Sequence, residues 1–121
     1  MTMRILTVDD SQTMRDMLAM TLQGAGYDVL QAENGQEGLD VLKGSEVDLI
    51  ITDLNMPVMD GFDFIEHVRS NSQHNATPIL ILTTESAGEK KERGRAAGAT
   101  GWIVKPFEPE KLLGVIRKVS P

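Results

Sequence analysis

The chain contains no cysteine among its 121 residues, so it offers neither a disulfide framework nor a thiolate metal site. It also lacks an excess of basic residues, since the net charge is −6 and the isoelectric point is about 4.8. An acidic chain is a poor partner for nucleic acid or for an anionic membrane surface. Apolar runs long enough to cross a bilayer are also missing. These absences favour a globular protein without nucleic-acid or membrane binding, and we expect it to be a monomer.

The N-terminal stretch MTMRILTVDD enters a strand-like run at once and has none of the features of a secretory signal peptide. We therefore expect a cytoplasmic location. The length is that of one domain, and no low-complexity segment or linker divides it. We predict a single domain over residues 1–121 with no output domain.

Strand-like apolar runs alternate with helical patterns five times along the chain. The runs predict strands over 4–8, 27–32, 47–52, 77–83 and 100–105, and helices over 11–26, 35–44, 61–70, 86–99 and 108–119. Such alternation favours an α/β fold with a parallel sheet covered on both faces. The chain is too short for an eight-stranded barrel, which leaves an open, doubly wound, five-stranded sheet of flavodoxin-like (βα)5 type. Ligands of such sheets bind outside the carboxyl ends of the strands.

Side chains suited to chemistry follow the predicted strands at their carboxyl ends. Asp9 and Asp10 follow the first strand, Asp53 the third, Thr83 ends the fourth, and Lys105 ends the fifth. Three carboxylates about 5 Å apart repel by roughly 3 kcal/mol per pair at an effective dielectric near 20, and one lysine offsets only part of that. We therefore expect this edge either to take up a proton or to bind a cation.

The available ligands are hard oxygens, which select Mg²⁺, with Mn²⁺ or Ca²⁺ as substitutes. Asn55, just past the third strand, is placed to add its backbone carbonyl. A carboxylate beside a metal, a hydroxyl and a lysine is suited to phosphoryl transfer, with the carboxylate as nucleophile.

The stretches TVDDSQTMR, DLNMPVMDG, ILILTTES and GWIVKPF together resemble a two-component response-regulator receiver domain, and within that family the stand-alone receivers of chemotaxis. The likeness covers essentially the whole chain and implies the strand order 2-1-3-4-5. It further implies that the protein accepts a phosphoryl group from a CheA-like sensor histidine kinase. The output face then binds a flagellar motor switch protein until autodephosphorylation ends the signal. Such a receiver catalyses only its own phosphorylation and dephosphorylation, so we expect no enzyme acting on other substrates.

The resemblance also assigns roles to individual residues. It implies that Asp53 is the phosphoacceptor, and that Asp9, Asp10, Asp53 and the backbone carbonyl of Asn55 hold Mg²⁺. Asn55 and Glu85 match the positions that tune dephosphorylation in the family, and their identities predict a short-lived phosphoryl group.

By the same resemblance, Thr83 is the switch hydroxyl, Lys105 contacts the phosphoryl group, and the peptide bond before Pro106 is cis. Trp102 occupies the position of the switch aromatic, where receivers usually carry Tyr or Phe. An indole is bulkier and requires a partner for its N–H when buried, so we expect its inward rotamer to be restricted.

Several other interpretations are compatible with these residues. Asp9 and Asp10 are also suited to capping the first helix, and Trp102 to half-buried packing. A receiver can serve as a phosphate sink that drains a shared kinase. An aspartate-nucleophile phosphohydrolase usually carries Asp-x-Asp, whereas Asp53-Leu54-Asn55 lacks the second acid. A flavodoxin-like cofactor binder would place a hydroxyl- and glycine-rich loop where this chain has DDSQ, which repels phosphate without a metal.

Overall fold

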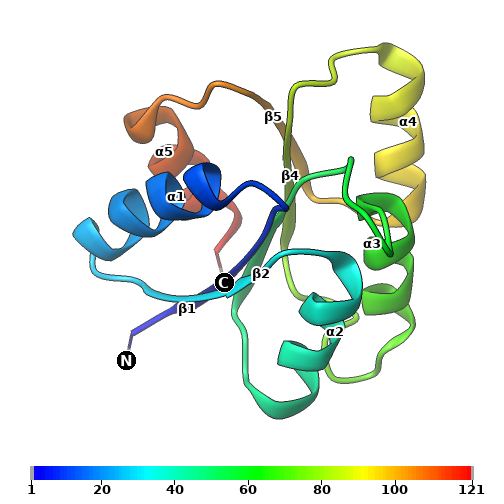
Figure 1. The fold of residues 1–121 in the computed structure, drawn as a ribbon, viewed down its shortest axis with the longest axis horizontal. Coiled ribbons are helices and arrows are strands. Elements are labelled where there is room, and N and C mark those ends of the chain that lie inside the picture. The colour runs from blue at the N-terminus through cyan, green and yellow to red at the C-terminus, as the bar shows by residue number, and fades with distance from the viewer. Residues whose placement is uncertain (1, 121) are drawn as a thin grey trace.

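A computed structural model, which describes residues 2–120, has five parallel strands in one sheet with the order β2-β1-β3-β4-β5 (Figure 1). The predicted fold class and strand order are therefore confirmed. The strands and helices alternate along the chain as β1 Arg4–Val8, α1 Gln12–Gly24, β2 Asp28–Ala32, α2 Gly35–Gly44, β3 Leu49–Thr52, α3 Gly61–Ser70, β4 Ile79–Thr83, α4 Gly88–Ala97, β5 Gly101–Val104 and α5 Pro109–Val119.

The observed boundaries lie within two residues of the predicted ones. The start of β4 shows why they differ. Pro78 was expected among the first residues of this strand, but it lies just before the strand, because proline has no N–H to donate to the ladder. Its carbonyl still accepts a hydrogen bond from the N–H of Ile50, at an N···O distance of 2.9 Å.

Helices cover both faces of the sheet, with α1 and α5 on one face and α2, α3 and α4 on the other (Figure 1). Every residue of β3 and β4 is buried. These strands therefore read as continuous apolar runs rather than alternating ones, which is typical of a parallel sheet covered on both sides. Two cores result, one on each face. Their largest fully buried members include Leu18, Leu22 and Ile51 on the α1 side, and Ile50, Phe64 and Ile65 on the α3 side.

Helix α4 is held less firmly than the other helices. Its sequence is polar and bears glycine, and within the described chain it buries only Gly94. Ala87 precedes it and makes no capping bond with its side chain among residues 2–120. The opposite end is anchored, since the carbonyl of Gly98 accepts a hydrogen bond from Nε of Arg69 at 2.9 Å. The helix is therefore fixed at its C-terminal end and lightly held at its N-terminal end.

The lengths and compositions of the helices also decide whether any of them could cross a membrane. Between residues 2 and 120, the helices are all too short or too polar to span a bilayer.

Candidate functional site

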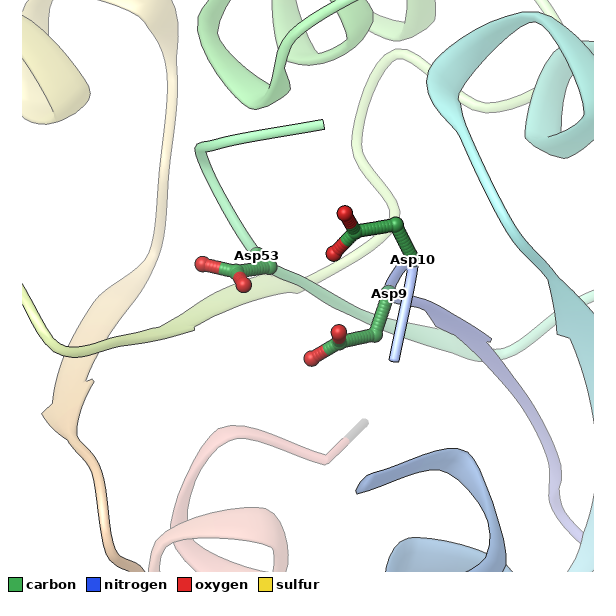
Figure 2. Close-up of side chains that lie close together, drawn as sticks. All are labelled: Asp9, Asp10 and Asp53. Atoms are coloured by element: carbon green, nitrogen blue, oxygen red, sulfur yellow. The ribbon is translucent and has the colours of Figure 1, made fainter. Parts of the chain in front are cut away.

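Three carboxylates meet where β1 and β3 end. Asp9, Asp10 and Asp53 each offer an oxygen, and these oxygens lie within 4.8 Å of one another (Figure 2). The strands β1 and β3 are adjacent and parallel, with Val8 opposite Thr52, so the residues that follow them leave the sheet at the same edge. Asp9 and Asp53 are buried, whereas Asp10 is exposed.

Lys105 bridges two of the three carboxylates. Its Nζ lies 2.9 Å from Oδ2 of Asp9 and 2.8 Å from Oδ2 of Asp53, and its side chain is only 12% exposed. Burial alone lowers the pKa of Lys105, but the hydrogen bonds and charges of Asp53 and Asp9 outweigh burial and raise this pKa. The ammonium is therefore firmly protonated at neutral pH. The Lys105–Pro106 peptide bond is cis, the isomer that the family resemblance implies.

Main-chain contacts fix the orientation of Asp53. Its Oδ1 accepts a hydrogen bond from the N–H of Leu54 at 2.7 Å, and its own N–H donates to the carbonyl of Val8 at 2.9 Å. The loop that follows folds back against it, because the N–H of Gly61 donates to the carbonyl of Leu54 at 2.9 Å. A Cβ at Gly61 would lie 2.2 Å from the carbonyl oxygen of Asp53, so this close approach requires glycine.

The turn between β1 and α1 is equally well defined. The hydroxyl of Ser11 accepts a hydrogen bond from the N–H of Met14, so Ser11 is the N-cap of α1. The alternative that Asp9 or Asp10 caps this helix is wrong. Oδ1 of Asp9 instead accepts from the N–H of Ser11 at 2.9 Å, which leaves the Asp9 carboxylate pointing into the site.

Glu85, in the β4–α4 loop, links Thr83 at the end of β4 to Trp102 on β5. The buried hydroxyl of Thr83 accepts a long hydrogen bond, 3.4 Å, from the N–H of Glu85. Nε1 of Trp102 donates to the carbonyl of Glu85 at 3.0 Å, so the indole has the partner that its burial requires. The Glu85 carboxylate pairs with Nζ of Lys90 at 3.1 Å. Trp102 also packs against the core on the α3 side, so the same side chain contributes to core packing and contacts the β4–α4 loop.

The donor set of this edge fits a hard divalent cation. All three clustered groups are carboxylates, and one lysine balances a single negative charge, so the excess favours a dication. Asn55 is exposed in the loop directly after Asp53. The contribution of its carbonyl remains a prediction.

One residue of this region was not anticipated from the sequence. Arg15 is buried in α1, and its Nη1 donates to the backbone carbonyl of Asp9 at 2.6 Å. A signal was present, because Arg15, Leu18 and Leu22 recur at helical spacing and share the buried face of this helix. The pattern shows which face is buried, but not which carbonyl a guanidinium on that face contacts.

Comparison with known proteins agrees with this geometry. Residues 5–117 match the model of the response regulator receiver domain. The chain belongs to the response-regulator receiver family. It is 43% identical to the chemotaxis protein CheY1 of Helicobacter pylori, over 91% of this chain and 90% of that protein. It is 36% identical to the chemotaxis protein CheY-3 of Vibrio cholerae, over 97% of this chain and 91% of that protein. The crystal structure of Vibrio cholerae CheY4 superposes with a TM-score of 0.95 and 51% identity, covering 98% of this chain and 99% of that one.

Proposed function

We propose that this protein is a phosphorylation-activated response regulator of chemotaxis, in which Asp53 accepts the phosphoryl group. The observation that carries the proposal is the convergence of Asp9, Asp10 and Asp53 around Lys105 at the carboxyl edge of the sheet. The chemotaxis setting is supported by the similarity to the proteins named CheY1, CheY-3 and CheY4.

An ionised Asp53 needs no general base to act as a nucleophile. One of its oxygens forms a bond to the phosphorus while the bond from phosphorus to the donor histidine nitrogen breaks, and the departing imidazole takes up a proton. Asp53 is held by the N–H of Leu54 and by Lys105, so its orientation is set before a donor arrives. Lys105 stays protonated because its pKa is raised, and its ammonium neutralises an oxygen of the transferring group.

The acidic residues of the edge would hold Mg²⁺ through Asp9, Asp10, Asp53 and the Asn55 carbonyl. When bound, this ion would supply charge neutralisation at the phosphoryl oxygens. Asn55 and Glu85 belong to the two loops at this edge, and we propose that they set a short phosphoryl lifetime.

The contacts of Thr83 explain how a phosphoryl group on Asp53 would change the conformation of the β4–α4 loop. Among residues 2–120 the hydroxyl of Thr83 is engaged only by a long bond from the N–H of Glu85, and a phosphoryl oxygen on Asp53 would be a stronger partner for its O–H. Movement of Thr83 toward Asp53 would pull on the loop that Trp102 and Lys90 hold from the other side. The change at the acceptor thereby reaches the outer surface near α4 and β5.

The charge of the chain supports an acidic partner on that surface. Residues 88–121 hold eight of the twelve Lys and Arg but four of the eighteen Asp and Glu, a net charge of +4, which leaves −10 for residues 1–87. Lys105 is one of the eight and lies in the site, so the other residues of 88–121 carry +3. A groove along β5 and α5 adds apolar contacts from Ile103, Val104, Phe107 and Val115 beside Lys111. We propose that an acidic amphipathic segment of a flagellar motor switch protein binds here.

The first test measures steady-state phosphate release from acetyl phosphate, with and without Mg²⁺. Wild type should release phosphate only with Mg²⁺, and Asp53→Asn should release none. Asp28→Asn makes the same substitution at the opposite edge of the sheet and should behave as wild type. Turnover that persists in Asp53→Asn would place the nucleophile elsewhere.

The second test measures binding of an N-terminal peptide from a flagellar motor switch protein, with and without beryllofluoride as a phosphoryl mimic. We expect tighter binding with the mimic, lost in Lys111→Glu but kept in Lys43→Glu on α2. Failure to bind in both states, for a protein that still turns over acetyl phosphate, would favour the phosphate sink.

A further inference from the structure

Arg15 is a buried charge that the proposed chemistry leaves unused. It is 8% exposed, and within residues 2–120 no carboxylate lies within ion-pair distance of it. Burial of a charge without such a partner is costly unless its donors are satisfied. Its Nη1 donates to the carbonyl of Asp9 at 2.6 Å, and its Nη2 donates to Oε1 of Gln12 at 2.7 Å. A leucine at this helix position would bury apolar surface without that cost, so the arginine calls for a functional explanation.

The carbonyl that Arg15 holds belongs to the peptide unit joining Asp9 to Asp10. A peptide unit is planar and carries the Cα atoms of both aspartates, so a contact at its oxygen restrains both residues. This matters most for Asp10, which is exposed and whose carboxylate has no hydrogen-bond partner in the described part of the chain. The described contacts therefore restrain Asp10 through its main chain and not through its carboxylate.

The other contacts of this turn do not involve the peptide unit that joins the two aspartates. The N–H of Asp9 donates to the carbonyl of Ala32 at 3.1 Å, and its carboxylate accepts from Ser11 and Lys105. Arg15 supplies the contact at the peptide unit between Asp9 and Asp10. Gln12 supports the guanidinium from the surface, since its Oε1 accepts from Arg15 while its Nε2 donates to Asp16 at 2.8 Å.

We infer that Arg15 is a positioning residue for a divalent cation, which holds the Asp9–Asp10 peptide so that both carboxylates face the bound ion. The inference rests on the proposed Mg²⁺ site. Contacts that orient metal ligands in this way typically change metal affinity about 10- to 100-fold. An effect of charge alone has the opposite sign, because a guanidinium repels a cation and its removal would tighten binding.

The test measures Mn²⁺ binding to the unphosphorylated protein, with free Mn²⁺ quantified by electron paramagnetic resonance. Arg15→Gln should weaken Mn²⁺ binding about tenfold. Arg15→Lys keeps the positive charge, but its side chain is shorter and cannot make both bonds of the guanidinium. Its Mn²⁺ affinity should lie between those of Arg15→Gln and wild type. Gln12→Ala removes only the side chain that accepts from Nη2 of Arg15, so it should weaken Mn²⁺ binding less than Arg15→Gln does. Arg69→Gln is the matched control, because Arg69 also clamps backbone carbonyls, those of Gly98 and Thr77, away from the site.

The outcomes separate the two proposals. Mn²⁺ binding by folded Arg15→Gln that equals or exceeds wild type overturns the role of Arg15 and leaves the metal site standing. If circular dichroism shows that Arg15→Gln does not fold, Gln12→Ala decides, and unchanged binding in that variant overturns the inference. A wild-type protein that binds no Mn²⁺ overturns the metal site itself, and the inference with it. Weakening in both Arg15→Gln and Gln12→Ala, without weakening in Arg69→Gln, supports it.

Discussion

The β1–α1 turn and the β4–α4 loop lie at the same edge of the sheet, but they are held in very different ways. In the first, Asp9 is bonded through its N–H, its carbonyl and both carboxylate oxygens, and Ser11 caps the helix that follows. In the second, the bond between Glu85 and Thr83 is 3.4 Å long, and Ala87 offers no side-chain cap within the described residues. The Lys90–Glu85 pair is partly exposed.

This difference indicates a division of roles between the two segments. A cation site requires ligands that are already placed, because ordering them on binding would cost free energy. A switch requires a segment of low local stability, which a modest change in contacts can shift. The well-bonded turn carries Asp9 and Asp10, and the lightly held loop follows Thr83 and leads to α4. Four substitutions test this division, beginning with the one expected to have the largest effect.

Gly61→Ala disturbs the β3–α3 loop, which holds Asp53 next to the well-bonded β1–α1 turn. The added methyl would lie 2.2 Å from the carbonyl oxygen of Asp53 and 2.8 Å from Cα of Leu54, so the backbone on one side must shift. We expect the free energy of unfolding to fall by about 3 kcal/mol, measured by urea denaturation. Gly44→Ala is the matched control, since a Cβ there meets nothing within 4 Å. An equal cost in the two variants would show that the β3–α3 loop is not tightly packed against Asp53.

Lys105→Met removes the cation shared by Asp9 and Asp53, and metal-free protein should lose about 2 kcal/mol of stability near neutral pH. The pKa of Lys105 is raised above its ordinary value of 10.5 by these carboxylates, against the effect of burial. A raised pKa means that the contribution is fully present below about pH 10.5 and is lost as the pH rises through the folded-state value.

The measurement compares wild type with Lys105→Met by urea denaturation between pH 8 and pH 11. The difference in stability should narrow at the alkaline end. Lys43→Met serves as the control, because Lys43 is exposed and pairs with Asp40 at 3.9 Å only. A difference that stays constant up to pH 11 would show that the Lys105 charge contributes nothing to folding.

Much of this edge could be predicted from the sequence, for a specific physical reason. Parallel strands end at one edge, so once the five apolar runs are recognised, Asp9, Asp10, Asp53 and Lys105 must come close together. The starts of α1 and α5 could also be predicted, because Ser11 is a strong N-cap signal and Pro109 suits the first turn of a helix.

The contacts made by long side chains could not be predicted in this way. Arg15, Arg69 and Trp102 all bond to backbone carbonyls, and every residue offers such a carbonyl. Arg69 bonds to Gly98, 29 residues away, and Trp102 bonds to Glu85, 17 residues away, in loops whose conformation no periodicity encodes. Patterns of residue types indicate which face is buried, whereas these bonds depend on the finished tertiary structure.

Trp102→Phe tests the comparison from the other segment, because it weakens the β4–α4 loop, which is already lightly held. Phenylalanine keeps an aromatic ring but cannot donate to the carbonyl of Glu85, so we expect a loss of about 1 kcal/mol. Amide hydrogen exchange should become faster in residues 84–90 and stay unchanged in residues 9–15, which serve as the internal control. Equal acceleration in both segments would indicate general destabilisation rather than release of one loop.

Asp10→Asn should have the smallest effect and the opposite sign. Lys105 pairs with Asp9 and Asp53, so the exposed Asp10 adds a negative charge that no cation of the site balances. Its removal should stabilise the metal-free protein by about 0.5 kcal/mol, because an exposed charge is screened by solvent. Added Mg²⁺ should then stabilise the variant less than wild type, since one ligand is lost. Thermal melts with and without Mg²⁺ measure both effects, with Asp28→Asn as the control. If Asp10→Asn destabilises the metal-free protein, Asp10 contributes to folding through contacts of its own. The main role of the β1–α1 turn would then be to stabilise the fold, and cation binding would be secondary.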